Sequence, residues 1–224
     1  MLLDMEDKFT SIEKSDSVPS YPYYRGSNGL KYKYSKLNSL KYFNYDKALQ
    51  DNINFKLKEE LILKGIKNKK RVGLGETLIY DNPKVYIRQS AKELIASYEE
   101  RPSSANNSLY VFSLRDNSPE TITFLKYICG LINSTLYTFF AQQRRIIRYN
   151  KGKQPQIKTS DLYQIFVPEC EDMKLKISTL VNNIYKDSIC NEKHQAEIDR
   201  LIYEYYNLDE NEINIIKKSI EAFL

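Results

Sequence analysis

The chain has 224 residues, of which 42% are hydrophobic and 28% charged, with only seven glycines and seven prolines. These values predict a globular protein with one large domain, or a main domain with an appendage, and they exclude a disordered or fibrous chain. No apolar run approaches the roughly 20 residues that cross a bilayer, and the acidic start is unlike a signal peptide. We therefore expect a cytoplasmic protein with no membrane partner.

The net charge of +5 is distributed unevenly along the chain. Residues 1–20 carry two cations against five acids, residues 21–168 carry 25 against 12, and residues 169–224 carry seven against 12. Such an asymmetry suggests a polyanionic partner for the middle of the chain. We predict an acidic lead-in over 1–20, a binding domain over 21–168 and a C-terminal helical segment over 169–224.

The first half of the chain contains three predicted strands. Residues 1–20 are polar, and we expect them to be loose. Residues 31–34 alternate lysine and tyrosine with the period of two that is typical of a strand. Strand patterns return at 84–89, and again at 108–114, an apolar run suited to a central strand. The pattern over 53–75 is ambiguous and is compatible with a helix followed by a basic loop.

A long helix is predicted after residue 117. Ser118 is a suitable N-cap and Pro119 suits the first helical position. The apolar residues that follow share one helical face: Leu125, Ile128, Cys129, Ile132, Leu136, Phe139 and Phe140. A short helical turn and then a short strand are expected over 159–168.

The spacing of apolar residues in the last part of the chain predicts three acidic amphipathic helices. The first apolar stripe comprises Met173, Ile177, Leu180, Val181 and Ile184, and the second comprises Ile198, Leu201, Ile202, Tyr205 and Tyr206. Asp209 and Glu212 have the spacing of a capping box and indicate the start of the third helix. We expect these stripes to pack together and to dock a partner domain.

The sequence lacks the common catalytic motifs. It contains no glycine-rich phosphate loop, no HExxH and no GxSxG. Three dispersed cysteines and a single histidine are too few for a zinc site of ordinary spacing. We therefore predict no catalytic residue and no metal ligand, although dispersed acids leave a metal-dependent nuclease open as an alternative.

Residues 139–158, "FFAQQRRIIRYNKGKQPQIK", hold six cations and no acid. Stabilisation of a helix C-terminus explains two or three cations, but not a whole run without acids. Arginine and lysine hold DNA phosphates, and glutamine hydrogen-bonds the edge of adenine. We predict that phosphates are held by Arg144, Arg145, Arg148, Lys151 and Lys153, and that Gln154 reaches a base.

Two other groups are weaker candidates for DNA contact. Arg25, Lys31 and Lys33 lie in an acid-free, tyrosine-rich stretch and form a predicted second contact. Arg88 and Gln89 end a predicted strand and form a third. For both groups, a structural role in a sheet is as compatible with the sequence as contact with DNA.

The order of several segments resembles the TaqI-like C-terminal specificity domain of N6-adenine DNA methyltransferases in restriction–modification systems. The matching pieces are "YYRGSNGLKY", "NPKVYIRQ" followed by "NSLYVF", "LINS", the segment ending in "FVP", and "EIDRLIYEYYNLDENE". The resemblance covers about residues 20–222. It implies an α+β fold of irregular, curved β-structure with inserted helices, followed by a C-terminal helical appendage.

The resemblance also implies a function and partners. Such a domain binds duplex DNA and selects the sequence, while a separate methyltransferase or endonuclease domain or subunit performs the chemistry with S-adenosylmethionine. The NPPY-type motif and the glycine-rich cofactor loop of that catalytic domain are missing here, so we expect no cofactor in this chain. A basic module that binds RNA or an acidic protein is the other alternative.

Overall fold

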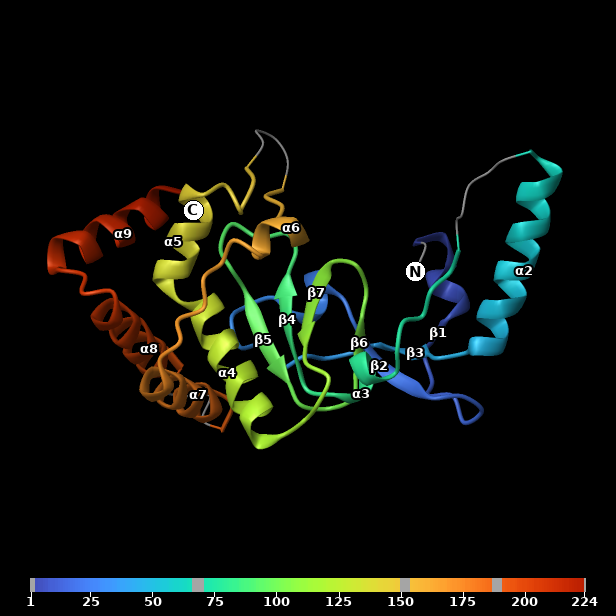
Figure 1. The fold of residues 1–224 in the computed structure, drawn as a ribbon, viewed down its shortest axis with the longest axis horizontal. Helices are drawn as coiled ribbons and strands as arrows, with labels where there is room; N and C mark the ends of the chain where they lie inside the picture. The colour runs from blue at the N-terminus through green and yellow to red at the C-terminus, as the bar shows by residue number, and fades with distance from the viewer. Residues whose placement is uncertain (1–2, 66–70, 150–153, 187–190, 224) are drawn as a thin grey trace.

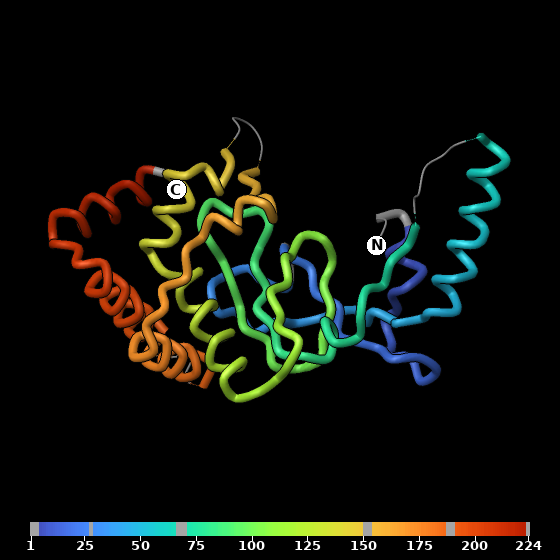
Figure 2. The backbone as a smooth tube through the Cα atoms, viewed as in Figure 1, coloured from blue at the N-terminus to red at the C-terminus, as the bar shows by residue number. Residues whose placement is uncertain are grey.

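The computed structural model describes residues 3–65, 71–149, 154–186 and 191–223, and places them in two small sheets surrounded by helices. Figure 1 shows the three-stranded second sheet at the centre, the C-terminal helices on one side of it, and the first sheet with the projecting helix α2 on the other. Figure 2 traces the same path of the backbone. This arrangement confirms the predicted α+β class with inserted helices and a helical C-terminal part.

The first sheet has the strand order β1-β3-β2-β6. These strands are Thr10–Ser11, Lys41–Asn44, Ser20–Tyr24 and Ser104–Ala105, respectively. β1 and β2 run antiparallel to β3, and β6 runs parallel to β2. The expectation of a loose N-terminal segment is wrong: η1 (Leu3–Lys8) leads into β1, and Phe9 is fully buried in the apolar cluster beneath this sheet.

Helix α2 (Lys47–Leu63) projects from the first sheet (Figure 1). It begins at Asp46, whose side chain accepts a hydrogen bond from the Leu49 N–H at 2.8 Å. Ile53 is the buried residue of this helix, so most of its surface faces solvent. The ambiguous 53–75 region therefore contains the second half of a helix, and the chain then returns along it, because Asn54 hydrogen-bonds both backbone groups of Val72.

The second sheet is antiparallel, with the order β5-β4-β7. Its strands are Ala96–Glu99, Lys84–Arg88 and Leu109–Ser113, and the short helix α3 (Leu78–Asp81) precedes β4. The predicted strands at 84–89 and 108–114 are confirmed, but β7 lies at an edge and not in the centre. The central strand is β4, of which Lys84 to Ile87 are buried.

The predicted strand at 31–34 is wrong. The short helix α1 (Gly26–Gly29) is followed by an irregular turn, in which Tyr34 has a φ of 56°. The Tyr34 N–H donates to the carbonyl of Ala96 at 3.0 Å, which fixes the turn against β5. The alternation of lysine and tyrosine therefore reflects a buried Tyr34 and an exposed Tyr32 within a turn.

The predicted long helix is divided into two. α4 (Pro119–Asn133) begins at the predicted N-cap, Ser118, and α5 (Thr135–Gln143) follows after Ser134. The backbone of Ser134 is extended, and its hydroxyl caps α5 by accepting from the Tyr137 N–H. Asp199 adds a second cap, because its carboxylate accepts from the Thr135 N–H and hydroxyl, each at 2.7 Å.

The three predicted C-terminal helices are confirmed as α7 (Glu171–Lys186), α8 (Asn191–Tyr205) and α9 (Glu210–Phe223). Asp209 and Glu212 cap α9 reciprocally, at 2.9 and 2.8 Å. The apolar stripes of α7 and α8 are buried with α4 and the second sheet in one core. Contacts within the chain cover most of these two stripes, but Tyr205 and Tyr206 of the second stripe are exposed, and docking of a partner domain stays a prediction. None of the described helices has the length and apolarity that a membrane span requires.

Candidate functional site

The structure brings cations of the 139–158 region onto a pair of chain segments that is joined by a single β-bridge at one end of the second sheet (Figure 1). We call its described part, residues 144–149 and 154–158, the basic ribbon. Arg148 and Gln156 form an antiparallel bridge in it, with N–H···O distances of 2.9 and 3.1 Å. Lys151 and Lys153, both predicted phosphate contacts, lie outside the described residues.

The first strand of the ribbon leaves α5 through a tight turn. Arg144 caps the C-terminus of α5, and Arg145 has a φ of 55°, which is uncommon for a residue with a side chain. The N–H groups of Ile146 and Ile147 donate to the carbonyl of Ala141 at 2.8 and 3.1 Å, and both isoleucine side chains are buried. This anchor holds the two preceding arginines at the surface.

The second strand is fixed to the end of β4. The Ile157 N–H donates to the carbonyl of Gln89 at 2.8 Å, and the Tyr110 hydroxyl donates to the carbonyl of Ile157 at 2.7 Å. The Ser90 hydroxyl donates to the carbonyl of Pro155 at 2.8 Å. The ribbon is thus a braced extension of the second sheet.

Three cations of the ribbon have no acidic partner among the described residues. Arg144 and Arg145 are exposed, and Arg144 lies over the Phe140 ring, 5.8 Å from its centroid. Lys158, the N-cap of α6 (Thr159–Leu162), is also exposed. Lys158 was missing from the predicted contacts, although the same acid-free run contains it. Uncompensated cations on a braced element are suited to holding phosphates.

Arg148 is placed differently from the other arginines. Its Nε and Nη2 donate to the carboxylate of Asp161 at 3.0 and 2.9 Å. The Asp161 side chain is only 8% exposed, whereas that of Arg148 is 44% exposed. The orientation of this guanidinium is therefore fixed by a buried acid, and its charge is partly neutralised.

Arg88 and Gln89 brace the loops around the end of β4. The Gln89 amide donates to the Tyr110 hydroxyl at 3.1 Å, and this is the hydroxyl that holds the ribbon. Arg88 donates to the carbonyl of Lys31 at 3.5 Å. Both side chains are half-buried and support the ribbon and the 31–34 turn.

The predicted second contact is divided between two places. Arg25, which precedes α1, forms an ion pair with Glu6 of η1, and this hydrogen bond raises the pKa of the Arg25 guanidinium. Lys33 pairs with Glu93 at 2.8 Å. Lys31 remains exposed, with its ammonium 5.1 Å from the centroid of the Tyr32 ring. Of these three cations, only Lys31 has no acidic partner among the described residues.

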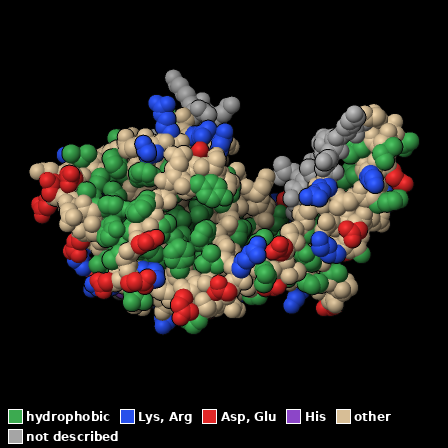
Figure 3. Space-filling model, in the orientation of Figure 1, with side chains coloured by type: hydrophobic (Ala, Val, Ile, Leu, Met, Phe, Trp, Pro, Cys, Tyr) green, Lys and Arg blue, Asp and Glu red, His purple; other side chains and the backbone are tan. Residues whose placement is uncertain are grey.

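The surface beside the ribbon is apolar. Figure 3 shows lysine and arginine side chains at the edge where the ribbon lies, next to a broad hydrophobic area. A groove of about 330 Å³ lies there between β7, α4 and the segment after α6, and its lining residues include no charged side chain. Tyr163 and Phe166 on that segment are 86% and 62% exposed. The groove therefore presents a mainly apolar surface without a charged side chain to attract a phosphate.

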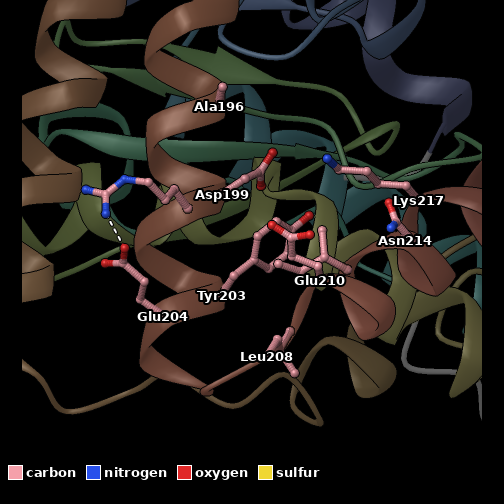
Figure 4. A pocket seen from close by; sticks show the side chains of 10 residues that line it. Ala196, Asp199, Tyr203, Glu204, Leu208, Glu210, Asn214 and Lys217 are labelled. Atoms are coloured by element: carbon pink, nitrogen blue, oxygen red, sulfur yellow. Dashed lines mark hydrogen bonds and ion pairs between the residues drawn. The ribbon is translucent and has the colours of Figure 1, made fainter.

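A second cavity, of about 660 Å³, lies between α8 and α9 (Figure 4). Figure 4 shows Glu204 paired with Arg200, while Lys217 and Asn214 face the cavity from α9. Asp199, which also lines it, is already engaged in capping α5. Within the part of the chain that the structure describes, no group of three or more histidine, cysteine, aspartate or glutamate side chains is arranged to hold a metal ion.

Comparison with known proteins gives a matching family and similar solved structures. The model of the TaqI-like C-terminal specificity domain matches residues 21–167. No curated protein sequence matches the chain. This chain is similar to a solved structure of the Type IIL restriction–modification enzyme MmeI in complex with DNA, with a TM-score of 0.58 and 12% sequence identity between the two. The match covers 98% of this chain but only 34% of the MmeI chain. At this identity the likeness concerns the fold.

Proposed function

The chain belongs to the family of TaqI-like C-terminal specificity domains, and from this membership we propose that it binds duplex DNA through the basic ribbon and selects the sequence on which a restriction–modification enzyme acts. The observation that carries the proposal is the cluster of Arg144, Arg145 and Lys158. These exposed cations have no acidic partner among the described residues, and they stand on an element that is braced by hydrogen bonds to β4.

We further propose that the chemistry resides in a separate methyltransferase or endonuclease domain or subunit, with S-adenosylmethionine bound there. The chain spans about a third of the length of the MmeI chain that it matches, which leaves room for such a part in a relative of that kind. The sequence lacks the motifs of the catalytic domain. In this proposal the chain acts in the cytoplasm, is not an enzyme on its own, and directs adenine methylation, cleavage or both.

The double variant Arg144→Ala, Arg145→Ala tests the role of the ribbon. We expect weaker binding to every duplex and a salt dependence reduced by about two units of slope, because each lost phosphate contact removes about 0.9 units. The measurement is fluorescence anisotropy on a pool of labelled random duplexes at several salt concentrations.

A control variant with the same net charge separates local contact from overall attraction. Lys217→Ala, Lys218→Ala removes two exposed cations from α9, on the helical side of the molecule. We expect it to bind like the unmodified chain. Equal losses in both double variants would contradict the assignment to the ribbon, and so would unchanged binding in the arginine variant.

A further inference from the structure

Arg148 and Gln156 lie opposite each other on the exposed face of the basic ribbon. They exchange both backbone hydrogen bonds, so they are a hydrogen-bonded antiparallel pair whose Cα atoms are about 5.5 Å apart. Both residues are exposed, whereas Ile147 and Ile157, the neighbours of each on its strand, are buried. Because two directly opposed residues of an antiparallel pair project their side chains from the same face, and both residues are exposed, Arg148 and Gln156 point to the same, outer face.

The contact with Asp161 leaves the outer side of the Arg148 guanidinium free. A guanidinium carries five N–H donors, and the carboxylate of Asp161 takes one on Nε and one on Nη2. Three donors therefore remain on Nη1 and Nη2, and two of these point in parallel away from the buried acid. Such a pair of parallel donors matches the O6 and N7 acceptors of guanine in the major groove.

Gln156 differs from the other glutamines around the ribbon. Gln89 donates to the Tyr110 hydroxyl, and Gln154 accepts from the Ser90 hydroxyl at 3.2 Å. The side-chain amide of Gln156 makes no hydrogen bond to the described residues, and the residue is exposed. A free amide offers a donor and an acceptor, which match N7 and the N6 amino group of adenine.

We propose that Arg148 and Gln156 form the base-reading pair of the ribbon, with Arg148 on a guanine and Gln156 on an adenine of an adjacent base pair in the major groove. The inference rests on the proposed function and adds the residues and bases that provide specificity. Two antiparallel chain segments joined by a β-bridge are narrow enough to enter the major groove as a β-ribbon does, and the spacing of about 5.5 Å between the two Cα atoms lets long side chains reach base pairs stacked about 3.4 Å apart. Asp161 is a positioning residue that orients Arg148.

The test is to enrich random duplexes on the full chain and to sequence the retained DNA for the unmodified protein, Gln156→Ala, Arg148→Lys and the matched control Gln164→Ala, which changes an exposed glutamine outside the basic ribbon. We expect a guanine next to an adenine in the enriched motif. Gln156→Ala should lose roughly five- to 150-fold preference at the adenine position alone, the range expected for one bidentate contact. Arg148→Lys keeps the positive charge but loses the two parallel donors, so it should relax the guanine position while overall affinity stays similar.

The outcomes separate the inference from the proposed function. If the unmodified chain retains no duplex, the proposed function fails and the inference with it. If it retains duplexes without sequence preference, or if Gln156→Ala and Gln164→Ala both keep the unmodified motif, DNA binding stands and the base-reading pair is wrong. Thermal unfolding of each variant shows whether it is folded, and only a base-reading role predicts a changed motif in a folded variant.

Discussion

At the scale of single residues, Lys84 in β4 makes the free energy of unfolding depend on pH. Its side chain is fully buried, and its ammonium donates to the carbonyl of Tyr80 at 2.9 Å and to Ser103 at 3.4 Å. Burial lowers the pKa of Lys84 to about 8, although the charges of Glu99 and Asp81 act in the opposite direction. Between pH 8 and the ordinary lysine pKa of about 10.4, the unfolded chain therefore binds more protons than the folded chain.

The sign of this difference predicts that the contribution of Lys84 to the free energy of unfolding rises with pH above 8. The contribution of Lys84 between pH 8 and 9 is about 1 kcal/mol. Urea unfolding of the unmodified protein and of Lys84→Met at several pH values isolates the contribution of Lys84. Other groups, such as Cys129 and the buried tyrosines, contribute equally to the free energy of unfolding of both proteins. Parallel stability curves for the two proteins would contradict the lowered pKa.

The sequence revealed the cations of the site but not their partners. The acid-free run over 139–158 indicated a binding surface, and the structure places Arg144 and Arg145 at the surface there. Arg25 and Lys33 were also predicted contacts, yet they pair with Glu6 and Glu93, which lie far away along the chain. Composition reports the charge of a segment, whereas the fold determines which charges remain uncompensated.

At the scale of elements, the contact between α4 and α7 depends on Gly130. A Cβ atom at this position would overlap the Cγ2 methyl group of Ile177 and would lie 3.2 Å from Val181. We expect Gly130→Ala to lower the free energy of unfolding by about 1–3 kcal/mol through overpacking, although alanine favours a helix over glycine.

Gly73→Ala is the matched control in urea unfolding. A Cβ atom at position 73 meets no atom within 4 Å, so the free energy of unfolding should change by no more than about 0.5 kcal/mol. A Gly130→Ala variant as stable as this control would show that α4 and α7 are not in close contact.

Helix positions were predicted better than strand positions because helical periodicity extends over many residues. The N-cap at Ser118 and the capping box at Asp209 were visible as local patterns. The break at Ser134 was not visible, because the apolar spacing continues across it and Asp199, which caps α5, lies 64 residues after Thr135. The pattern at 31–34 was too short to distinguish a strand from a turn that buries Tyr34 against β5.

At the scale of the whole molecule, two surfaces of different chemistry lie side by side. The basic ribbon extends from the second sheet, and the adjacent groove over β7 and α4 is apolar (Figure 3). The family match over residues 21–167 confirms the resemblance that the sequence motifs indicated. The predicted domain boundaries at residues 20 and 168 stay predictions. Contacts cross both of them, because β1 pairs with β3 and α7 packs on α4.

The most direct test of DNA recognition is the salt dependence of duplex binding by the full chain. Fluorescence anisotropy with labelled random duplexes at three salt concentrations, with RNA of equal length as competitor, measures it. If five or six phosphates are contacted, the logarithm of the affinity should fall by roughly five units for a tenfold rise in salt, and duplex DNA should outcompete RNA. No binding at low salt, a slope near zero, or preference for RNA would contradict the account.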